Sequence, residues 1–307
     1  MSNHPQVDLS RWMRQFPLDY FQQSSGPRRF HNQAADDPRD LWKPSGDPIS
    51  SPADLSKVEW VRRQVALRYD LGPAKPVDLF LWQVAPAPHP YLTRIGGIPY
   101  RDKSSPWPVD RHDNPYTFVA QFCFLDSLDI LPISIPGDLL LVFFRDHEAP
   151  MGEMDDVGLE WVRIRDVIPI GEGDCPKPSF TVPRLTGVIR RFDEFPSCEG
   201  DPFRADGHVR SYLFPTTQST KIGTVTYFVQ GDPRLSFDGT LICTLNSLEP
   251  HERWPFVDLK DLPGQASNSL DSEYYGWGPY EMMFGDVGCM YFFIDSEGTT
   301  HWRFDSY

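Results

Sequence analysis

Two stretches of the 307-residue sequence share one pattern, RIGGIPY at 94–100 and KIGTVTY at 221–227. Each begins with a basic residue, isoleucine and glycine, and each ends in tyrosine. A short apolar segment follows in both cases, FVAQF at 118–122 and LICTL at 241–245. The order of these blocks indicates that the chain contains two copies of one unit.

A third block completes the repeat: Gly-Asp, four residues, then two aromatic residues. It starts at Gly137 and again at Gly285, and the second copy is 21 residues longer between its first and third blocks. Three blocks in the same order predict an internally duplicated β unit, in which each copy buries its apolar face against the other. The residues that define this structural repeat are Gly96, Gly137, Asp138, Gly223, Gly285 and Asp286.

From residue 78 onward the chain consists of short segments rich in β-branched and aromatic residues, separated by clusters of Gly, Pro, Asn and Asp. This pattern is typical of strands, and the scarcity of long helical patterns between them favours antiparallel pairing. A Gly-containing turn at 295–299 predicts a hairpin. The predicted strands cover 78–84, 116–124, 137–146, 159–167, 186–192, 207–214, 223–230, 239–245, 287–295 and 299–305.

One long helix is predicted over 52–71, where apolar residues recur at helical spacing between Pro52 and the stop at Gly72-Pro73. We therefore expect an α+β class, mainly antiparallel β, with an N-terminal helical extension. The predicted divisions are a helix and loop extension at 1–75 and a single domain at 76–307, made of two β repeats at about 78–200 and 207–307.

Composition excludes several classes of protein. Lysine and arginine number 29 against 43 aspartates and glutamates, and a net charge of −14 disfavours nucleic acid as a partner. The 31 prolines argue against a helical bundle, and the 40% of hydrophobic residues argues against disorder. The sequence shows no secretory signal, no apolar run of membrane length and no C-x-x-C pair, which predicts a cytoplasmic protein without a membrane association.

The repeat blocks also carry a family resemblance. In the first copy they continue with Trp107-Pro108 and the strand EWVRI at 160–164, and the last block of the second copy is FGDVGCMYFFI at 284–294. Together these blocks resemble the YwqG-like family, a bacterial domain of unknown function, over about residues 78–307. The second copy departs from the family pattern at Gly223-Thr224, where Gly-Gly is usual. The resemblance implies no catalytic residues, and some relatives look like neighbours of secreted-toxin genes.

Motifs of common hydrolases, zinc proteases and nucleotide enzymes are absent from the sequence, so we expect no catalytic residues, no cofactor and no metal. The two Gly-Asp pairs have two interpretations. Their carboxylates could meet at a pseudo-twofold axis and bind a metal or share a proton. The favoured interpretation is a turn before each apolar strand, capped by the aspartate side chain.

Two features predict a surface that binds a partner. The first is an acidic segment at 146–160 without Lys or Arg, which is either a solvated loop or a surface that attracts a basic partner. The second is a group of aromatic residues, suited to anchor an interface or to cover an edge of the β core. The predicted partner-binding residues are Asp146, Glu148, Glu153, Asp155, Asp156, Glu160, Tyr275, Trp277 and Tyr280.

Three functional hypotheses follow. The favoured one is a non-catalytic protein-binding protein, a cytosolic immunity protein that neutralises a basic secreted toxin through the acidic and aromatic surface. The alternative is an enzyme or small-ligand-binding protein with a cleft between the repeats, using Asp138, Asp286, His147 and His301. The third is an interaction domain without a toxin partner, in which residues 1–75 recruit other proteins.

Overall fold

The computed structural model describes residues 72–84, 86–152, 154–196, 216, 219–235, 237–248, 281–286 and 288–306. They form one ten-stranded sheet in which every pair of neighbouring strands is antiparallel. The strands are β1 (Lys75–Gln83), β2 (Arg94–Ile95), β3 (Thr117–Cys123), β4 (Leu139–Phe144), β5 (Val157–Val162), β6 (Leu185–Glu194), β7 (Lys221–Ile222), β8 (Thr240–Asn246), β9 (Cys289–Ile294) and β10 (Thr300–Asp305).

The predicted α+β class with a helical N-terminal extension is wrong. The described part of the chain is mainly antiparallel β and holds no α-helix, only short 3-10 turns between strands. The helix expected over 52–71 lies outside the described residues, as do the strand expected over 207–214 and nearly all of the extension at 1–75. The strand expected over 223–230 is also wrong, because β7 ends at Ile222 and the chain continues as a loop.

The order of strands across the sheet is symmetric: β10-β9-β8-β7-β1-β6-β2-β3-β4-β5. On either side of the central pair, β1 and β6, comes a two-residue strand and then three strands in chain order. In this symmetric order β1–β5 form the first copy and β6–β10 the second, so that β6 begins the second copy. The long strands are then exchanged between the copies, since β1 pairs with β7 of the second copy and β6 pairs with β2 of the first. Neither copy therefore completes its half of the sheet alone.

The same irregularity recurs in both copies. The pairing of β3 with β4 shifts register between Phe118 and Ala120, and the pairing of β8 with β9 shifts at the matching place, on either side of Ile242. The carbonyl of each bulged residue accepts a backbone hydrogen bond from the repeat glycine: Gly96 N to Val119 O at 2.8 Å, and Gly223 N to Ile242 O at 2.9 Å. The two halves of the sheet thus share one irregularity, held by one kind of hydrogen bond at matching places.

Positive backbone angles explain why glycine occupies both places. Gly96 has φ of 60° and Gly223 has φ of 149°, a region that other residues rarely adopt. A Cβ on Gly96 would lie 2.3 Å from the carbonyl oxygen of Pro183, and one on Gly223 would lie 2.7 Å from Cγ1 of Val77. Each glycine permits close approach of a neighbouring segment where the chain leaves a two-residue strand.

The Gly-Asp pairs of the third block do not occupy equivalent positions in the two copies. Strand pairing matches Leu139 with Cys289, because each lies opposite the last residue of the preceding strand, Cys123 or Asn246. The residue before each strand is then Asp138 in the first copy and Gly288 in the second, so Asp286 lies two residues further upstream. A turn closed by the hydrogen bond from Gly288 N to Phe284 O, at 2.7 Å, accommodates these residues.

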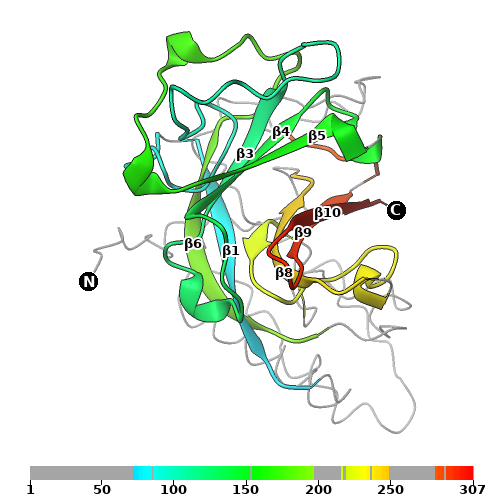
Figure 1. The fold of residues 1–307 in the computed structure, drawn as a ribbon. Coiled ribbons are helices and arrows are strands. Elements are labelled where there is room, and N and C mark those ends of the chain that lie inside the picture. The colour runs from blue at the N-terminus through cyan, green and yellow to red at the C-terminus, as the bar shows by residue number, and fades with distance from the viewer. Residues whose placement is uncertain are drawn as a thin grey trace, which may run out of the picture.

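The sheet curls into a half-barrel, so that its edge strands β5 and β10 approach each other (Figure 1). Nε1 of Trp161 in β5 donates a hydrogen bond to Oγ1 of Thr300 in β10 at 2.7 Å. Apolar side chains of both copies fill the interior of the curl, and rings of the two copies meet there: Phe122 with Phe292 at 6.0 Å between centroids, and Phe144 with Phe284 at 5.9 Å.

The outer face of each copy carries a smaller apolar cluster. In the first copy it includes Phe143, covered by Tyr100 and Trp107 from the loop between β2 and β3. In the second copy it includes Phe293, covered by Phe228 and Phe237 from the loop between β7 and β8. With both faces covered, almost every residue of β3, β4, β8 and β9 is buried.

Candidate partner-binding surface

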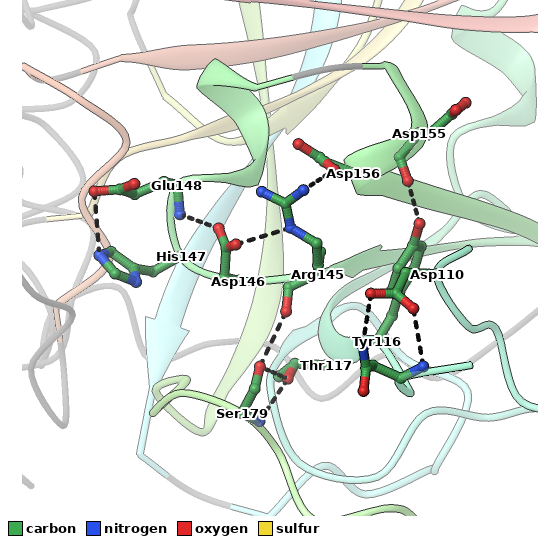
Figure 2. Close-up of polar contacts among 11 residues, drawn as sticks. Asp110, Tyr116, Thr117, Arg145, Asp146, His147, Glu148, Asp155, Asp156 and Ser179 are labelled. Carbon is green, nitrogen blue, oxygen red and sulfur yellow. Dashed lines mark hydrogen bonds and ion pairs between the residues drawn. The ribbon is translucent and has the colours of Figure 1, made fainter. Parts of the chain in front are cut away.

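Arg145 organises the beginning of the acidic segment, where the chain leaves β4 (Figure 2). Its Nη1 lies 2.5 Å from Oδ1 of Asp156, and its Nε donates to Oδ2 of Asp146 at 2.9 Å. The side chain of Asp156 is only 7% exposed, against 43% for Arg145. The hydrogen bond to Asp146 raises the pKa of Arg145. Arg145, just before the acidic segment, therefore forms ion pairs with two of the segment's carboxylates.

Asp146 also fixes the turn that follows β4. Its Oδ1 accepts the backbone N–H of Glu148 at 2.9 Å, next to the 3-10 turn η4 (Ala149–Met151). The side chain of Glu148 is 71% exposed, and its Oε1 lies 3.8 Å from Nε2 of His147. The carboxylate of Glu148 is thus displayed to solvent from a turn whose backbone is held in place.

Near Asp155, the acidic segment is hydrogen-bonded to Tyr116, a residue of the first copy's outer apolar cluster. Tyr116 donates its hydroxyl to the carbonyl oxygen of Asp155, and the side chain of Asp155 remains exposed (Figure 2). Ser179 bridges from below: its Oγ donates to Arg145 O at 3.1 Å and its N–H donates to Oγ1 of Thr117 at 2.9 Å. Side chains from three separate segments, Tyr116, Asp146 and Ser179, therefore hold the backbone of this surface.

Glu160 ends the acidic segment inside a polar cluster of its own. Nε and Nη2 of Arg101 donate to Oε2 of Glu160 at 3.1 and 2.9 Å, and Arg101 is only 2% exposed. The guanidinium lies 5.1 Å from the centroid of the Trp107 ring and also donates to the carbonyl oxygens of Ser105 and Pro106. Through this ion pair, Glu160 holds the loop between β2 and β3 against the sheet.

The structure divides the predicted partner-binding residues into two groups. Asp146, Asp156 and Glu160 form ion pairs with arginines, whereas Glu148 and Asp155 present exposed carboxylates. Sequence reasoning missed Arg101, because 59 residues separate it from Glu160 and no local pattern connects them. The remaining predicted residues, Glu153, Tyr275, Trp277 and Tyr280, lie outside the described part of the chain.

The Gly-Asp carboxylates occupy separate local settings. Oδ2 of Asp138 accepts the backbone N–H of Ile164 at 2.8 Å, whereas Asp286 lies exposed in the turn before β9. His301 binds Asp295 at 2.7 Å in the last hairpin, and His147 lies beside Glu148. The described residues contain no group of three or more His, Cys, Asp or Glu side chains that could hold a metal ion. Among the same residues, no helix has the length and hydropathy that crossing a membrane requires.

Fold and surface together define a pseudo-symmetric antiparallel β protein whose first copy carries an acidic segment with ion pairs to Arg145 and Arg101. Within that copy, the family Domain of unknown function (DUF1963) matches residues 93–165, from just before β2 to just past β5. No curated protein matches the chain. The match supports an uncharacterised-domain family for the segment that contains Arg101, Arg145 and their three carboxylate partners, Asp146, Asp156 and Glu160.

Proposed function

We propose that this protein is a non-catalytic binding protein that engages a basic protein partner through Glu148, Asp155 and their neighbours. The observation that carries the proposal is the exposure of these two carboxylates on backbone that hydrogen bonds from Asp146 and Tyr116 hold, between ion pairs at Arg145 and at Arg101. A surface that is ordered before binding loses less conformational entropy when a partner docks.

The charge of the chain supports a basic partner. The net charge of −14 attracts a cationic protein over distances near the Debye length, about 8 Å at physiological ionic strength. Exposed carboxylates at the rim of an interface act mainly on the association rate and on its salt dependence. We therefore expect Glu148 and Asp155 to steer the approach of the partner, while other contacts hold the complex.

The finer proposal is a cytosolic immunity protein of the YwqG-like family that blocks a basic secreted toxin. Its support is the family resemblance, in which some relatives look like neighbours of secreted-toxin genes, together with the acidic surface. Co-expression tests it: the product of the adjacent gene should stop growth when expressed alone, and this protein should restore growth and co-purify with that product. An adjacent product that is harmless alone would contradict the immunity role.

A further inference from the structure

The strand β5 forms one free edge of the sheet, directly after the acidic segment. It pairs with β4 alone, and no strand lies beyond it in the described part of the chain. In an antiparallel pair, residues that hydrogen-bond to the neighbouring strand alternate with residues whose N–H and C=O groups point away from it. The second kind of residue decides what the edge of β5 offers to another chain.

The register of β4 and β5 identifies these residues. Arg145 N donates to Asp156 O at 2.9 Å, in line with the pairing of the two strands. Every second residue from Asp156 onward, including Gly158 and Glu160, therefore bonds to β4. The residues between them point their N–H and C=O groups toward the free edge: Val157, Leu159 and Trp161.

This edge lacks the features that usually protect an exposed strand. Proteins blunt such edges with lysine, proline, β-bulges or inward-pointing charges. The sequence of β5, VGLEWV, contains no lysine or proline, and its pairing with β4 shows no register shift. Its one charged residue, Glu160, is bound to Arg101. At the opposite edge, β10 carries the exposed Arg303, and the turn η4 packs against it. Of the two edges, β5 is thus the less protected.

The surroundings of β5 determine which segment fits beside it. Asp155, with an exposed carboxylate, comes two residues before the strand, and the exposed Glu148 precedes the turn η4 in the same connection. Leu159 and Trp161 pack against the inner core while remaining partly exposed. The edge therefore combines outward-pointing backbone groups with apolar side chains on its inner side and negative charge at its beginning.

Building on the proposed function, we propose that an extended segment of the basic partner adds as a strand beside β5. This segment carries apolar side chains at alternate positions and lysine or arginine at the end next to Asp155. Its backbone hydrogen bonds hold the complex that the carboxylates attract, as in other cases of strand addition. The charge disfavours a second copy of the chain as the occupant, since two chains with a net charge of −14 repel each other.

Amide hydrogen exchange, followed by NMR, tests the pairing directly. The probe is a synthetic peptide of two lysines followed by alternating valine and threonine. At saturation it should slow exchange at the N–H groups of Leu159 and Trp161, which gain acceptors, and leave that of Gly158 unchanged, because β4 already bonds it. The same slowing at rising protein concentration without peptide would indicate self-association and would overturn the proposal.

A proline in β5 tests the role of the backbone. Leu159→Pro removes an N–H that points away from β4, and Leu159→Ala is the matched control, because it shortens the same side chain and keeps the N–H. We expect Leu159→Pro to weaken the affinity for the peptide at least about tenfold, and Leu159→Ala to weaken it much less. Equal losses in the two variants would show that the side chain alone makes the contact, against the proposal.

Modified peptides give the same test on the unchanged protein. N-methylation of every second residue should abolish binding in one frame, where the methyl groups face β5, and leave binding intact in the other frame. Equal binding of the two methylated peptides would overturn strand addition.

Charge variants separate this proposal from the proposed function. Glu148→Gln/Asp155→Asn should weaken the binding of the lysine peptide, yet saturating peptide should still slow exchange at Leu159 and Trp161. Unchanged affinity with the slowing retained would contradict the role of the carboxylates and leave strand addition supported. Binding that depends on the carboxylates but slows neither N–H group in the wild type would overturn strand addition and leave the role of the carboxylates supported.

Discussion

Arg101 shows how much a single residue contributes to the candidate surface. Its guanidinium is buried under the loop between β2 and β3, where Glu160, two carbonyl oxygens and the face of Trp107 surround it. A buried charge is tolerated only when it is paired and hydrogen-bonded, because desolvation otherwise costs several kcal/mol. The loop therefore depends on a carboxylate from the acidic segment.

Glu160→Gln should lower the free energy of unfolding by about 2 kcal/mol or more, because it leaves the Arg101 charge buried without its partner. Asp174→Asn is the matched control, since it removes one carboxylate from the exposed pair with Lys103, whose side chain is 61% exposed. That change should cost less than about 1 kcal/mol. Urea unfolding measures both, and equal effects would show that Glu160 contributes no more than a surface charge.

A pair of buried serines gives a second comparison at this scale. Oγ of Ser219 is buried and has no hydrogen-bond partner in the described structure, whereas Oγ of Ser127 donates to Asp78. Ser219→Ala should therefore leave stability unchanged or raise it by about 1 kcal/mol, and Ser127→Ala should lower it by about 1–2 kcal/mol. Thermal unfolding of the two variants measures both changes in stability. A loss of stability in Ser219→Ala would indicate that the Ser219 hydroxyl has a hydrogen-bond partner.

At the scale of elements, the final hairpin was the most predictable part of the fold. Asp295 accepts the backbone N–H groups of Glu297 and Thr299, each at 2.9 Å, and Gly298 takes a positive φ of 82°. These are local interactions, so the sequence pattern at 295–299 predicted the hairpin between β9 and β10 correctly. The strand predicted over 223–230 failed for the opposite reason, because Phe228 of that segment packs against Tyr291, 63 residues away.

The hairpin also predicts a dependence of stability on pH. The hydrogen bond from His301, followed by the one from Thr299 N, lowers the pKa of Asp295 below its ordinary value of 3.8. The stability contributed by this carboxylate is fully present above that ordinary value and is lost as the pH falls through the lowered native pKa. Asp295→Asn should therefore destabilise the protein at pH 7 and have a smaller effect at about pH 2.

Urea unfolding at the two pH values measures this difference. Asp286→Asn is a suitable control, because Asp286 is exposed in the turn that precedes β9. We expect the control to change stability little at either pH. An effect of Asp295→Asn that is the same at both pH values would contradict the assigned role of the carboxylate.

At the scale of the whole molecule, the exchange of β1 and β6 ties the two copies into one sheet. The repeat itself was visible in the sequence, because Gly96 and Gly223 must adopt unusual backbone angles in both copies. The exchange of strands could not be predicted from the sequence, since it depends on pairings such as Asp78 with Ile222, which join residues far apart in the chain. The division of the acidic segment into paired and exposed carboxylates was hidden for the same reason.

The exchange predicts cooperative unfolding of the two copies. Neither copy can lose its strands without removing the partner of a long strand from the other, so we expect one transition. Tryptophan fluorescence and far-UV circular dichroism, followed through the same urea titration, should give coincident midpoints. Two separate transitions would show that the copies are independent units.

The central claim is that Glu148 and Asp155 steer a basic partner, and its most direct test is the association rate constant measured by stopped flow. The adjacent gene product is mixed with the wild type, with Glu148→Gln/Asp155→Asn, and with Glu172→Gln/Glu297→Gln, which removes the same charge elsewhere. We predict that the first double variant slows association several-fold at low salt and flattens its salt dependence, while the second resembles the wild type. Equal slowing by both would contradict the claim, because net charge alone would then account for the attraction.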